Sequence, residues 1–443
     1  MSVAEVRLWG KTIGAVSWSP EQELAYFEYT PSFIKSGIQI APLMLPLSEQ
    51  IFAFPALSKQ TFQGLPGLLA DSLPDKFGNA LIDTWLVRAG RSPQSFDPVE
   101  RLSYIGTGGM GALEFFPVGG PKEKQSKKLD IEALVHLASE ILTHREALKT
   151  SFDAEDREEA MRDILRVGTS AGGARAKAII AWNPKTHEVR SGQVNAGEGF
   201  SYWLLKFDGV AGNRDKELND PLGYGLVEYA YYHMAKGAGI QMEECRLLSE
   251  NNRHHFMAKR FDRTDTGAKL HMQSLCALKH YDFNLAGAYS YEQAMQTMME
   301  LDLPKESVEE QFRRMIFNVM ARNQDDHVKN IAFLMDKAGQ WRLSPAFDMT
   351  FSYNPDGQWT NSHQMTINGK RDDFTLDDFE ACANRVFIRK SRALEIIEQV
   401  SKAVAKWPDH AALVGISEAR AIAIRKTLRG YLKSLGRGKP LED

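Results

Sequence analysis

The stretch FRRMIFNVMARNQDDHVKNIAFLMDKAGQWRLSPAFDMT, residues 312–350, decides how the rest of the chain is interpreted. Apolar residues recur at helical spacing before Asn323, which predicts an amphipathic helix packed on a core. The polar run 323–327 follows, and the apolar run 331–335 has the length and composition of a buried strand. After a turn, a second short strand leads to Asp348. We therefore expect a carboxylate of the polar run to face Asp348 across a hairpin.

The spacing of polar residues in this stretch points to phosphoryl transfer. Asp325 and Asn330 have four residues between them, as do the Asp and Asn of the protein-kinase catalytic loop, where the Asp takes or orients the substrate hydroxyl proton and the Asn holds magnesium. Phe347 and Asp348 occupy the place of the magnesium-binding Asp-Phe-Gly. This reaction requires positioning and charge neutralisation more than covalent help, and Lys329 can add positive charge beside the transferred group.

The composition indicates an ordinary globular protein of two or three domains. The chain has 443 residues, of which 43% are hydrophobic and 25% charged, enough for more than one core. A formal net charge of −3 argues against a protein that holds nucleic acid by its overall charge. The three cysteines lack the spacing of metal or redox motifs, so we expect reduced thiols. Because no signal-peptide profile and no apolar run of roughly 20 residues occurs, we expect a cytoplasmic protein without membrane contact.

The N-terminal part is predicted to be a small α+β unit. Residues 6–18 and 23–34 alternate apolar and polar side chains around turns, which predicts an antiparallel sheet. Residues 62–90 have the pattern of a helical stretch. The polar, lysine-rich run 119–130 is interpreted as a domain boundary.

A G-x-G-x-x-G pattern at Gly106, Gly108 and Gly111 is interpreted as a structural turn. A dinucleotide site needs a helix after the glycines, whereas the following ALEFFP has the pattern of a strand. A kinase glycine loop precedes a strand, but the next lysines lie in the polar run 119–130 and not on a core strand.

A second glycine-rich run, GTSAGGARAK at 168–177, allows backbone amides to approach phosphates and leads into a strand candidate at 176–182. It is not a Walker loop, because Ala and Arg follow the last glycine in place of Lys and Ser/Thr. The strand candidate 201–207 carries Lys206, which suits either a lysine that pairs with nucleotide phosphates or a snorkelling edge-strand lysine. Glu228, on a predicted helix, is the carboxylate that can pair with Lys206.

Two further segments complete the pattern. Residues 254–263 are predicted to be a strand entering a connection between lobes, where backbone groups of residues 259–261 can bind adenine. Residues 375–437 are predicted to be mainly helical, and for the basic stretch 419–439 we favour a solvated helix face over a surface that contacts a partner or DNA.

Taken in order, these motifs resemble the HipA family of bacterial serine/threonine kinases, the toxin components of type II toxin-antitoxin modules. The N-terminal part, with FQGLPGLLADSLPDKFGNAL and GGMGALEFFP, resembles the N-subdomain of that family. The motifs that carry the resemblance elsewhere are SAGGARAK (170–177), LLKF (204–207), KRFDR (259–263), NQDDHVKN (323–330) and SPAFDM (344–349).

The resemblance implies an α+β, two-lobed protein-kinase-like fold with a small N-terminal α+β subdomain and a mainly helical C-terminal lobe. The implied domains are an N-terminal subdomain at 1–120, a linker at 121–130, a kinase N-lobe with phosphate loop and hinge at 131–265, and a helical C-lobe with catalytic and metal-binding loops at 266–443.

The resemblance also implies roles for individual residues. Asp325 would be the catalytic base, Asn330 and Asp348 the ligands of Mg²⁺, and Lys206 the lysine that binds phosphate. Ser170, with Thr169 beside it as the other candidate, matches a serine that is autophosphorylated in the family. The roughly −1.5 to −2 charges of a phosphate there would be repelled by the ATP phosphates, ejecting the loop. The remaining implied ATP contacts are Gly172, Gly173, Ala174, Arg175, Ala176, Lys177, Lys259, Arg260, Phe261, His327, Val328, Lys329, Asn330, Phe347 and Asp348.

The implied function is transfer of the ATP γ-phosphate to a serine of a protein target related to translation, such as an aminoacyl-tRNA synthetase. The implied partner is a small helix-turn-helix antitoxin of the HipB type, and DNA would be contacted only through it. A small-molecule phosphotransferase is the first alternative, since the same Asp, Asn and Asp set serves such enzymes. Two others are a metal-dependent nuclease or phosphodiesterase built on Asp325, Asp326, His327 and Asp348, and a catalytically inactive corepressor.

Overall fold

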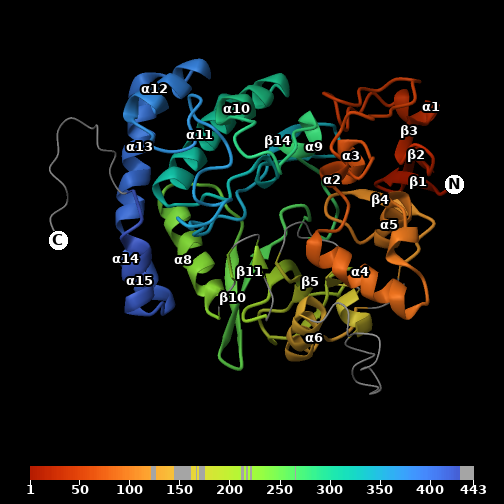
Figure 1. The fold of residues 1–443 in the computed structure, drawn as a ribbon, viewed down its shortest axis with the longest axis horizontal. Coiled ribbons are helices and arrows are strands. Elements are labelled where there is room, and N and C mark those ends of the chain that lie inside the picture. The colour runs from red at the N-terminus through yellow and green to blue at the C-terminus, as the bar shows by residue number, and fades with distance from the viewer. Residues whose placement is uncertain are drawn as a thin grey trace.

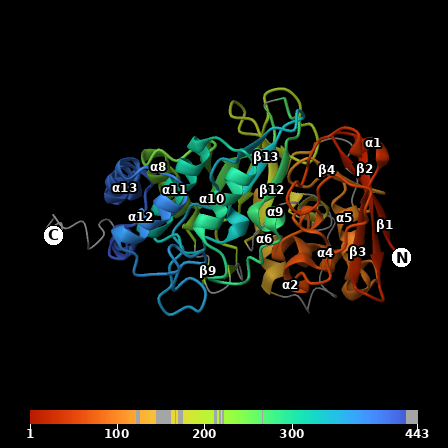
Figure 2. The same cartoon turned by 90° about the horizontal axis from the view of Figure 1, so that it is seen from above.

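The chain runs from a sheet at one end of the molecule to a stack of helices at the other (Figures 1 and 2). Between them lies a second sheet that carries part of the candidate site (Figure 1). The computed structural model describes residues 1–120, 126–143, 161–165, 167–168, 175–210, 214–215, 218–219, 222–264 and 266–429.

The N-terminal sheet is antiparallel, as predicted, and has the order β3-β2-β1-β4. Its strands are β1 (Val3–Leu8), β2 (Lys11–Ser19), β3 (Leu24–Tyr29) and β4 (Leu113–Phe116). Alternate residues of β1 are buried, because successive side chains point to opposite faces of a strand. The prediction that a strand follows the first glycine pattern is confirmed by β4.

Short helices cover this sheet, and one expectation about them was wrong. Residues 62–90 do not form one continuous helix: α2 ends at Phe62, and two separate helices follow, because Pro66 and Pro74 cannot continue a helix. The helices of this part are α1 (Pro31–Ile34), α2 (Lys59–Phe62), α3 (Gly67–Ala70), α4 (Lys76–Arg88), the 3-10 helix η1 (Pro93–Ser95) and α5 (Pro98–Ile105).

The second sheet has five antiparallel strands in the order β10-β11-β7-β5-β6. The strands are β5 (Lys177–Trp182), β6 (Val189–Ser191), β7 (Ser201–Lys206), β10 (Cys245–Glu250) and β11 (Arg253–Lys259), which confirms the three strands predicted here. Apolar residues of α4, α6 (Ile131–Thr143), β5 and β7 form one core. The helix α8 (Tyr224–Gly237) lies beside β10 and β11 (Figure 1). Two short strands, β8 (Arg214–Asp215) and β9 (Leu218–Asn219), pair with each other.

The C-terminal part is mainly helical, as predicted. The helix expected before Asn323 is α11 (Lys305–Met320). Its apolar residues at helical spacing are all fully buried, namely Phe312, Met315, Ile316, Val319 and Met320. The other helices are α9 (Leu275–Lys279), α10 (Tyr291–Glu300), η2 (Val328–Asn330), α12 (Leu376–Arg385), α13 (Lys390–Ala405), α14 (Trp407–Val414) and α15 (Glu418–Arg425). The basic stretch predicted at 419–439 begins within α15, and its residues from 430 onward lie outside the described part.

The predicted hairpin is present. It consists of β13 (Ala332–Met335), whose four residues are all buried, and β14 (Trp341–Leu343), with a turn at Gly339. A third strand, β12 (His271–Ser274), pairs with β13. None of the described helices has both the length and the apolar character required to span a membrane.

Candidate active site

Lys206 holds together two carboxylates from different elements. Its Nζ, at the end of β7, lies 2.5 Å from Oε1 of Glu228 on α8 and 2.7 Å from Oδ1 of Asp348, which follows β14. The side chains of Lys206 and Glu228 are 13% and 3% exposed. The predicted pairing of Lys206 with Glu228 is therefore confirmed, and the alternative of a snorkelling edge lysine is wrong.

The charges around Asp348 favour its ionised form. Burial opposes ionisation, but Lys206 and Lys177 lower the pKa of Asp348 to about 2. Asp348 adopts a left-handed backbone conformation with φ of 53°, which Asp tolerates better than most residues. The Asn323 side chain donates a hydrogen bond of 3.2 Å to the Asp348 carbonyl oxygen. The carboxylate is thus held in one place and kept negative at neutral pH.

Asp325 and Asp326 are adjacent in sequence but lie in different surroundings. The Asp326 side chain is 1% exposed and accepts hydrogen bonds from Tyr291 Oη at 2.7 Å and from the Gln364 amide at 2.8 Å. His363 Nδ1 lies 2.8 Å from the same carboxylate, and the pKa of Asp326 is lowered because this ion pair and the hydrogen bonds outweigh the opposing effect of burial. Asp326 therefore holds the loop in shape, and it also lines the small cavity that Asn330 and Asp348 border.

Asp325 is the exposed member of the pair. Its side chain is 17% exposed, and its Oδ1 accepts a hydrogen bond of 2.6 Å from the indole nitrogen of Trp359. The side-chain nitrogen of Asn330, Nδ2, donates a hydrogen bond of 2.9 Å to the backbone carbonyl oxygen of Asp325. The side-chain oxygen of Asn330 is therefore the atom suited to bind a cation. His327 packs its ring against Phe283 at a centroid distance of 5.3 Å.

Several predicted residues line one small cavity, whereas Val328 and Lys329 do not. Val328 is buried within η2, and Lys329 Nζ lies over the Phe283 ring, 5.2 Å from its centroid. The predicted residues that line the cavity are His327, Asn330, Phe347 and Asp348.

The predicted phosphate loop is only partly described. Arg175 places its guanidinium 3.8 Å from the ring centroid of Tyr224. Lys177 lies opposite Lys206 in the β5–β7 pairing, and its Nζ is 3.1 Å from Oδ2 of Asp75. The Ala176 carbonyl oxygen accepts a hydrogen bond from the Phe207 amide. Ser170, Gly172, Gly173 and Ala174 lie outside the described residues.

The Asp75–Lys177 ion pair was not predicted. Both side chains are at most 4% exposed, and Asp75 also caps α4 by accepting from the Gly78 amide at 2.6 Å. Burial raises the pKa of Asp75 although Lys177 opposes the shift. The capping position of Asp75 is visible in the sequence, but nothing there indicates that its second oxygen reaches a strand about a hundred residues later. Trp359 was missed for the same reason.

The predicted hinge lies beside Phe347, with one difference from expectation. The rings of Phe261 and Phe347 are 5.6 Å apart between centroids. The Lys259 amide donates to the Glu244 carbonyl oxygen at 2.8 Å, and the Arg260 amide to the Tyr202 carbonyl oxygen at 2.9 Å. These two amides are therefore not the donors for an adenine base in this conformation.

The acidic and amide groups suit Mg²⁺ bound together with a nucleotide. In the described part of the chain, no group of three or more His, Cys, Asp and Glu side chains is arranged to hold a metal ion. Mg²⁺ commonly uses only one or two carboxylates and takes its other ligands from water and substrate phosphates. The Asp348 carboxylate and the Asn330 amide oxygen match that requirement.

Comparisons with known proteins bear on the fold and the family of the chain. The HipA N-terminal domain model matches residues 4–116, and the HipA-like C-terminal domain model matches residues 169–407. A HipA structure from Shewanella oneidensis MR-1, solved in a complex with HipB and operator DNA, superposes with a TM-score of 0.64 at 17% identity, covering 97% of this chain and 98% of that one, and establishes the α+β fold.

Two other comparisons add little. The Helicobacter pylori proinflammatory kinase CtkA matches 51% of this chain and 92% of its own at 14% identity, with a TM-score of only 0.30. No curated protein sequence matches the chain. The two domain models together cover most of the sequence, and the chain belongs to the HipA family.

Proposed function

We propose that this chain is a HipA-type serine/threonine-protein kinase that acts in the cytoplasm and transfers the γ-phosphate of Mg-ATP to a serine of a protein. The observation that carries the proposal is the contact of one lysine, Lys206, with a helix carboxylate and with Asp348. Protein kinases require both a strand lysine paired with a helix glutamate and an acidic metal ligand in place for transfer. Here Lys206 Nζ lies within 2.7 Å of an oxygen of each of the two carboxylates, Glu228 and Asp348.

The proposed roles follow from the positions of the side chains. Asp325 takes or orients the proton of the substrate hydroxyl, while Trp359 fixes the direction of its carboxylate. Asn330 and Asp348 hold Mg²⁺, which when bound neutralises charge on the phosphates. Lys206, oriented by Glu228, contacts the phosphates.

The nucleotide site extends beyond these groups. The loop 172–177 covers the phosphates, residues 259–261 and Phe347 contact the base and ribose, and residues 327–330 line the metal side. The likeness of the whole chain to a HipA solved with HipB and DNA supports a helix-turn-helix antitoxin as partner, with DNA contacted through that partner. The family supports a toxin whose target belongs to translation, such as an aminoacyl-tRNA synthetase, and whose activity ends when Ser170 is phosphorylated.

Intact-mass spectrometry after incubation with Mg-ATP tests the proposal. The wild type, purified without phosphate, is compared with Asp325→Asn and Asp348→Asn, and Asp409→Asn serves as the control because Asp409 is an exposed carboxylate on α14. We expect one phosphate on the wild type and on the control, and none on the two site variants.

Further assays separate the alternatives. If the wild type gains no phosphate, calorimetry with Mg-ATP distinguishes a kinase that requires its partner or substrate, which binds nucleotide, from a protein that does not. A folded protein that neither binds Mg-ATP nor gains phosphate would contradict the proposal. Metal-dependent cleavage of nucleic acid without nucleotide would favour the nuclease, and phosphorylation of a small hydroxyl compound alone would favour the small-molecule kinase.

A further inference from the structure

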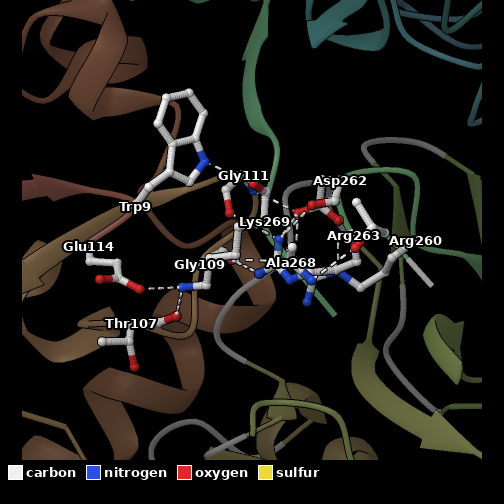
Figure 3. Close-up of polar contacts among 11 residues, drawn as sticks. Trp9, Thr107, Gly109, Gly111, Glu114, Arg260, Asp262, Arg263, Ala268 and Lys269 are labelled. Atoms are coloured by element: carbon white, nitrogen blue, oxygen red, sulfur yellow. Dashed lines mark hydrogen bonds and ion pairs between the residues drawn. The ribbon is translucent and has the colours of Figure 1, made fainter. Parts of the chain in front are cut away.

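The first glycine pattern of the sequence docks onto the segment that follows the hinge. The Gly111 amide donates a hydrogen bond of 2.7 Å to Oδ2 of Asp262, whose side chain is fully buried (Figure 3). Arg260 donates two hydrogen bonds to the same carboxylate, from Nε at 2.9 Å and from Nη2 at 2.7 Å. Arg263 donates a further one from Nη1 at 2.7 Å. One carboxylate thus joins the glycine turn of the N-terminal part to both arginines of the KRFDR motif.

The carbonyl groups of the glycine turn complete the set of contacts. The Gly109 carbonyl oxygen accepts from Arg263 at 3.2 Å and from Arg260 at 3.4 Å, and the Gly111 carbonyl oxygen accepts from Arg263 at 3.0 Å. Gly111 has a φ of +74°, and a Cβ there would lie 3.1 Å from the Met272 amide nitrogen. A glycine is therefore required where the turn meets the C-terminal part.

A second set of contacts lies beside the first. Lys269 Nζ is 2.8 Å from Oε1 of Glu114 and donates to the Thr107 carbonyl oxygen at 2.7 Å. The Trp9 indole nitrogen donates to the Lys269 carbonyl oxygen at 2.8 Å (Figure 3). Lys269 is thus bound both to a residue of the turn and to the N-terminal sheet.

Two guanidinium groups share one carboxylate in this cluster, which explains why the turn is needed. Arg260 and Arg263 both contact Asp262, and buried N–H donors that this carboxylate does not accept from require other acceptors. Burial and the neighbouring Arg260 lower the pKa of Arg263 to about 10, although Asp262 opposes the shift. The carbonyl groups of Gly109 and Gly111 supply the missing acceptors.

The cluster is connected to the candidate nucleotide site through one residue. Phe261 stands between Arg260 and Asp262 in the chain, and its ring contacts Phe347, the neighbour of Asp348. Clamping the residues on both sides of Phe261 fixes where its ring meets Phe347.

We propose that Asp262 and Arg263 are positioning residues for nucleotide binding, which hold Phe261 in place by tying it to the glycine turn of the N-terminal part. This inference rests on the proposed kinase function. It gives the N-terminal part an indirect influence on nucleotide affinity, exerted through Phe261.

Arg263→Met is the variant of choice for the test. Asp262→Asn would leave two buried guanidinium groups without a carboxylate and would endanger folding. In Arg263→Met the pair of Arg260 with Asp262 remains balanced, while the contacts with Gly109 and Gly111 from residue 263 are lost. Arg313→Met is the matched control: Arg313, on α11, is 8% exposed and also donates to a backbone carbonyl, that of Ala238 at the end of α8.

The measurement is calorimetric binding of Mg²⁺ with a non-hydrolysable ATP analogue, together with hydrogen exchange of the turn 106–111. We expect Arg263→Met to weaken binding about tenfold, equivalent to about 1.4 kcal/mol, and to speed exchange of the turn. In the kinase assay the same variant should raise KM for ATP about tenfold and leave kcat within about twofold. Arg263→Lys, which keeps the charge, should recover part of the affinity, and Arg313→Met should bind like the wild type.

Each outcome decides between the two proposals. Wild-type affinity in Arg263→Met, with the wild type itself binding the analogue, would overturn the positioning role and leave the kinase proposal intact. A loss of affinity of equal size in Arg313→Met would also overturn it, because the effect would then be general destabilisation. A wild type that binds no nucleotide would overturn the kinase proposal, and the positioning role with it.

Discussion

Replacing Lys206 with Met should destabilise the protein more than any loss of a surface ion pair. The ammonium group contacts Glu228 at 2.5 Å and Asp348 at 2.7 Å, and the Glu228 side chain is 3% exposed. Removing one partner of a buried ion pair costs about 3–5 kcal/mol, because the remaining charge is left without compensation. We therefore expect the free energy of unfolding of Lys206→Met, measured by urea denaturation at pH 7, to fall by about that amount.

A matched pair on the surface provides the control. Lys402 contacts Glu398 at 2.6 Å within α13, but the two side chains are 73% and 65% exposed. Because water already solvates both groups, Lys402→Met should change the free energy of unfolding by less than about 1 kcal/mol. The comparison isolates burial as the cause, since both variants lose a lysine in contact with a glutamate.

A second substitution tests the explanation itself. Adding Glu228→Gln to Lys206→Met removes the more buried of the two carboxylates that have lost their lysine, so the double variant should be more stable than Lys206→Met by about 2 kcal/mol. It should still lack phosphate transfer in the mass assay, because Lys206 is absent. The reasoning would be refuted if Lys206→Met were as stable as the wild type, or if Glu228→Gln lowered its stability further.

Three further predictions concern the acidic groups and the loop serine. Asp326→Asn should lower the free energy of unfolding by about 3 kcal/mol in urea denaturation, because Tyr291 and His363 lose a buried charged partner, whereas Asp325→Asn should leave stability within about 1 kcal/mol of the wild type. The folded-state pKa of Asp348 is about 2, below the unfolded value, so the contribution of its carboxylate to stability is complete above about pH 5 and is lost as pH falls toward 2. Because the side chain is 32% exposed, we expect the free energies of unfolding of wild type and Asp348→Asn to differ by only about 1–2 kcal/mol in urea titrations. This difference should shrink below about pH 4. Ser170→Ala should abolish the phosphopeptide that contains residue 170 after incubation with Mg-ATP, and mapping that places all phosphate elsewhere would contradict the switch.

Local patterns in the sequence predicted the elements that carry the site. The apolar spacing of α11, the buried run of β13 and the turn at Gly339 are each set by residues close in the chain, and all three were found. The contact of Lys206 with Glu228 was predicted because a strand lysine that binds nucleotide phosphates is paired with a helix carboxylate in protein kinases. The breaks in the helical stretch predicted at 62–90 were missed although Pro66 and Pro74 signalled them.

Contacts between distant segments were not predicted. Asp75 with Lys177 and Trp359 with Asp325 depend on how whole elements pack, and no periodic pattern records that. The glycine turn at 106–111 was correctly interpreted as structural, but its place against Asp262 required the fold. The residue roles in nucleotide binding stay predictions until the assays above are made.

These distant contacts bear on whether the two parts matched by separate family models can work apart. The Lys177 side chain, 4% exposed, forms its ion pair with Asp75 of the N-terminal part. The backbone amide of the buried Ser274 donates a hydrogen bond of 2.7 Å to the carboxylate of Asp71. Apolar residues of the N-terminal sheet and of the C-terminal helices also belong to one continuous core. A C-terminal part without residues 1–116 would therefore expose core surface and would leave Lys177 and the Arg260–Arg263 cluster short of acceptors beside the site. The N-terminal part is better regarded as a support for the segments that carry the candidate active site than as a separate module.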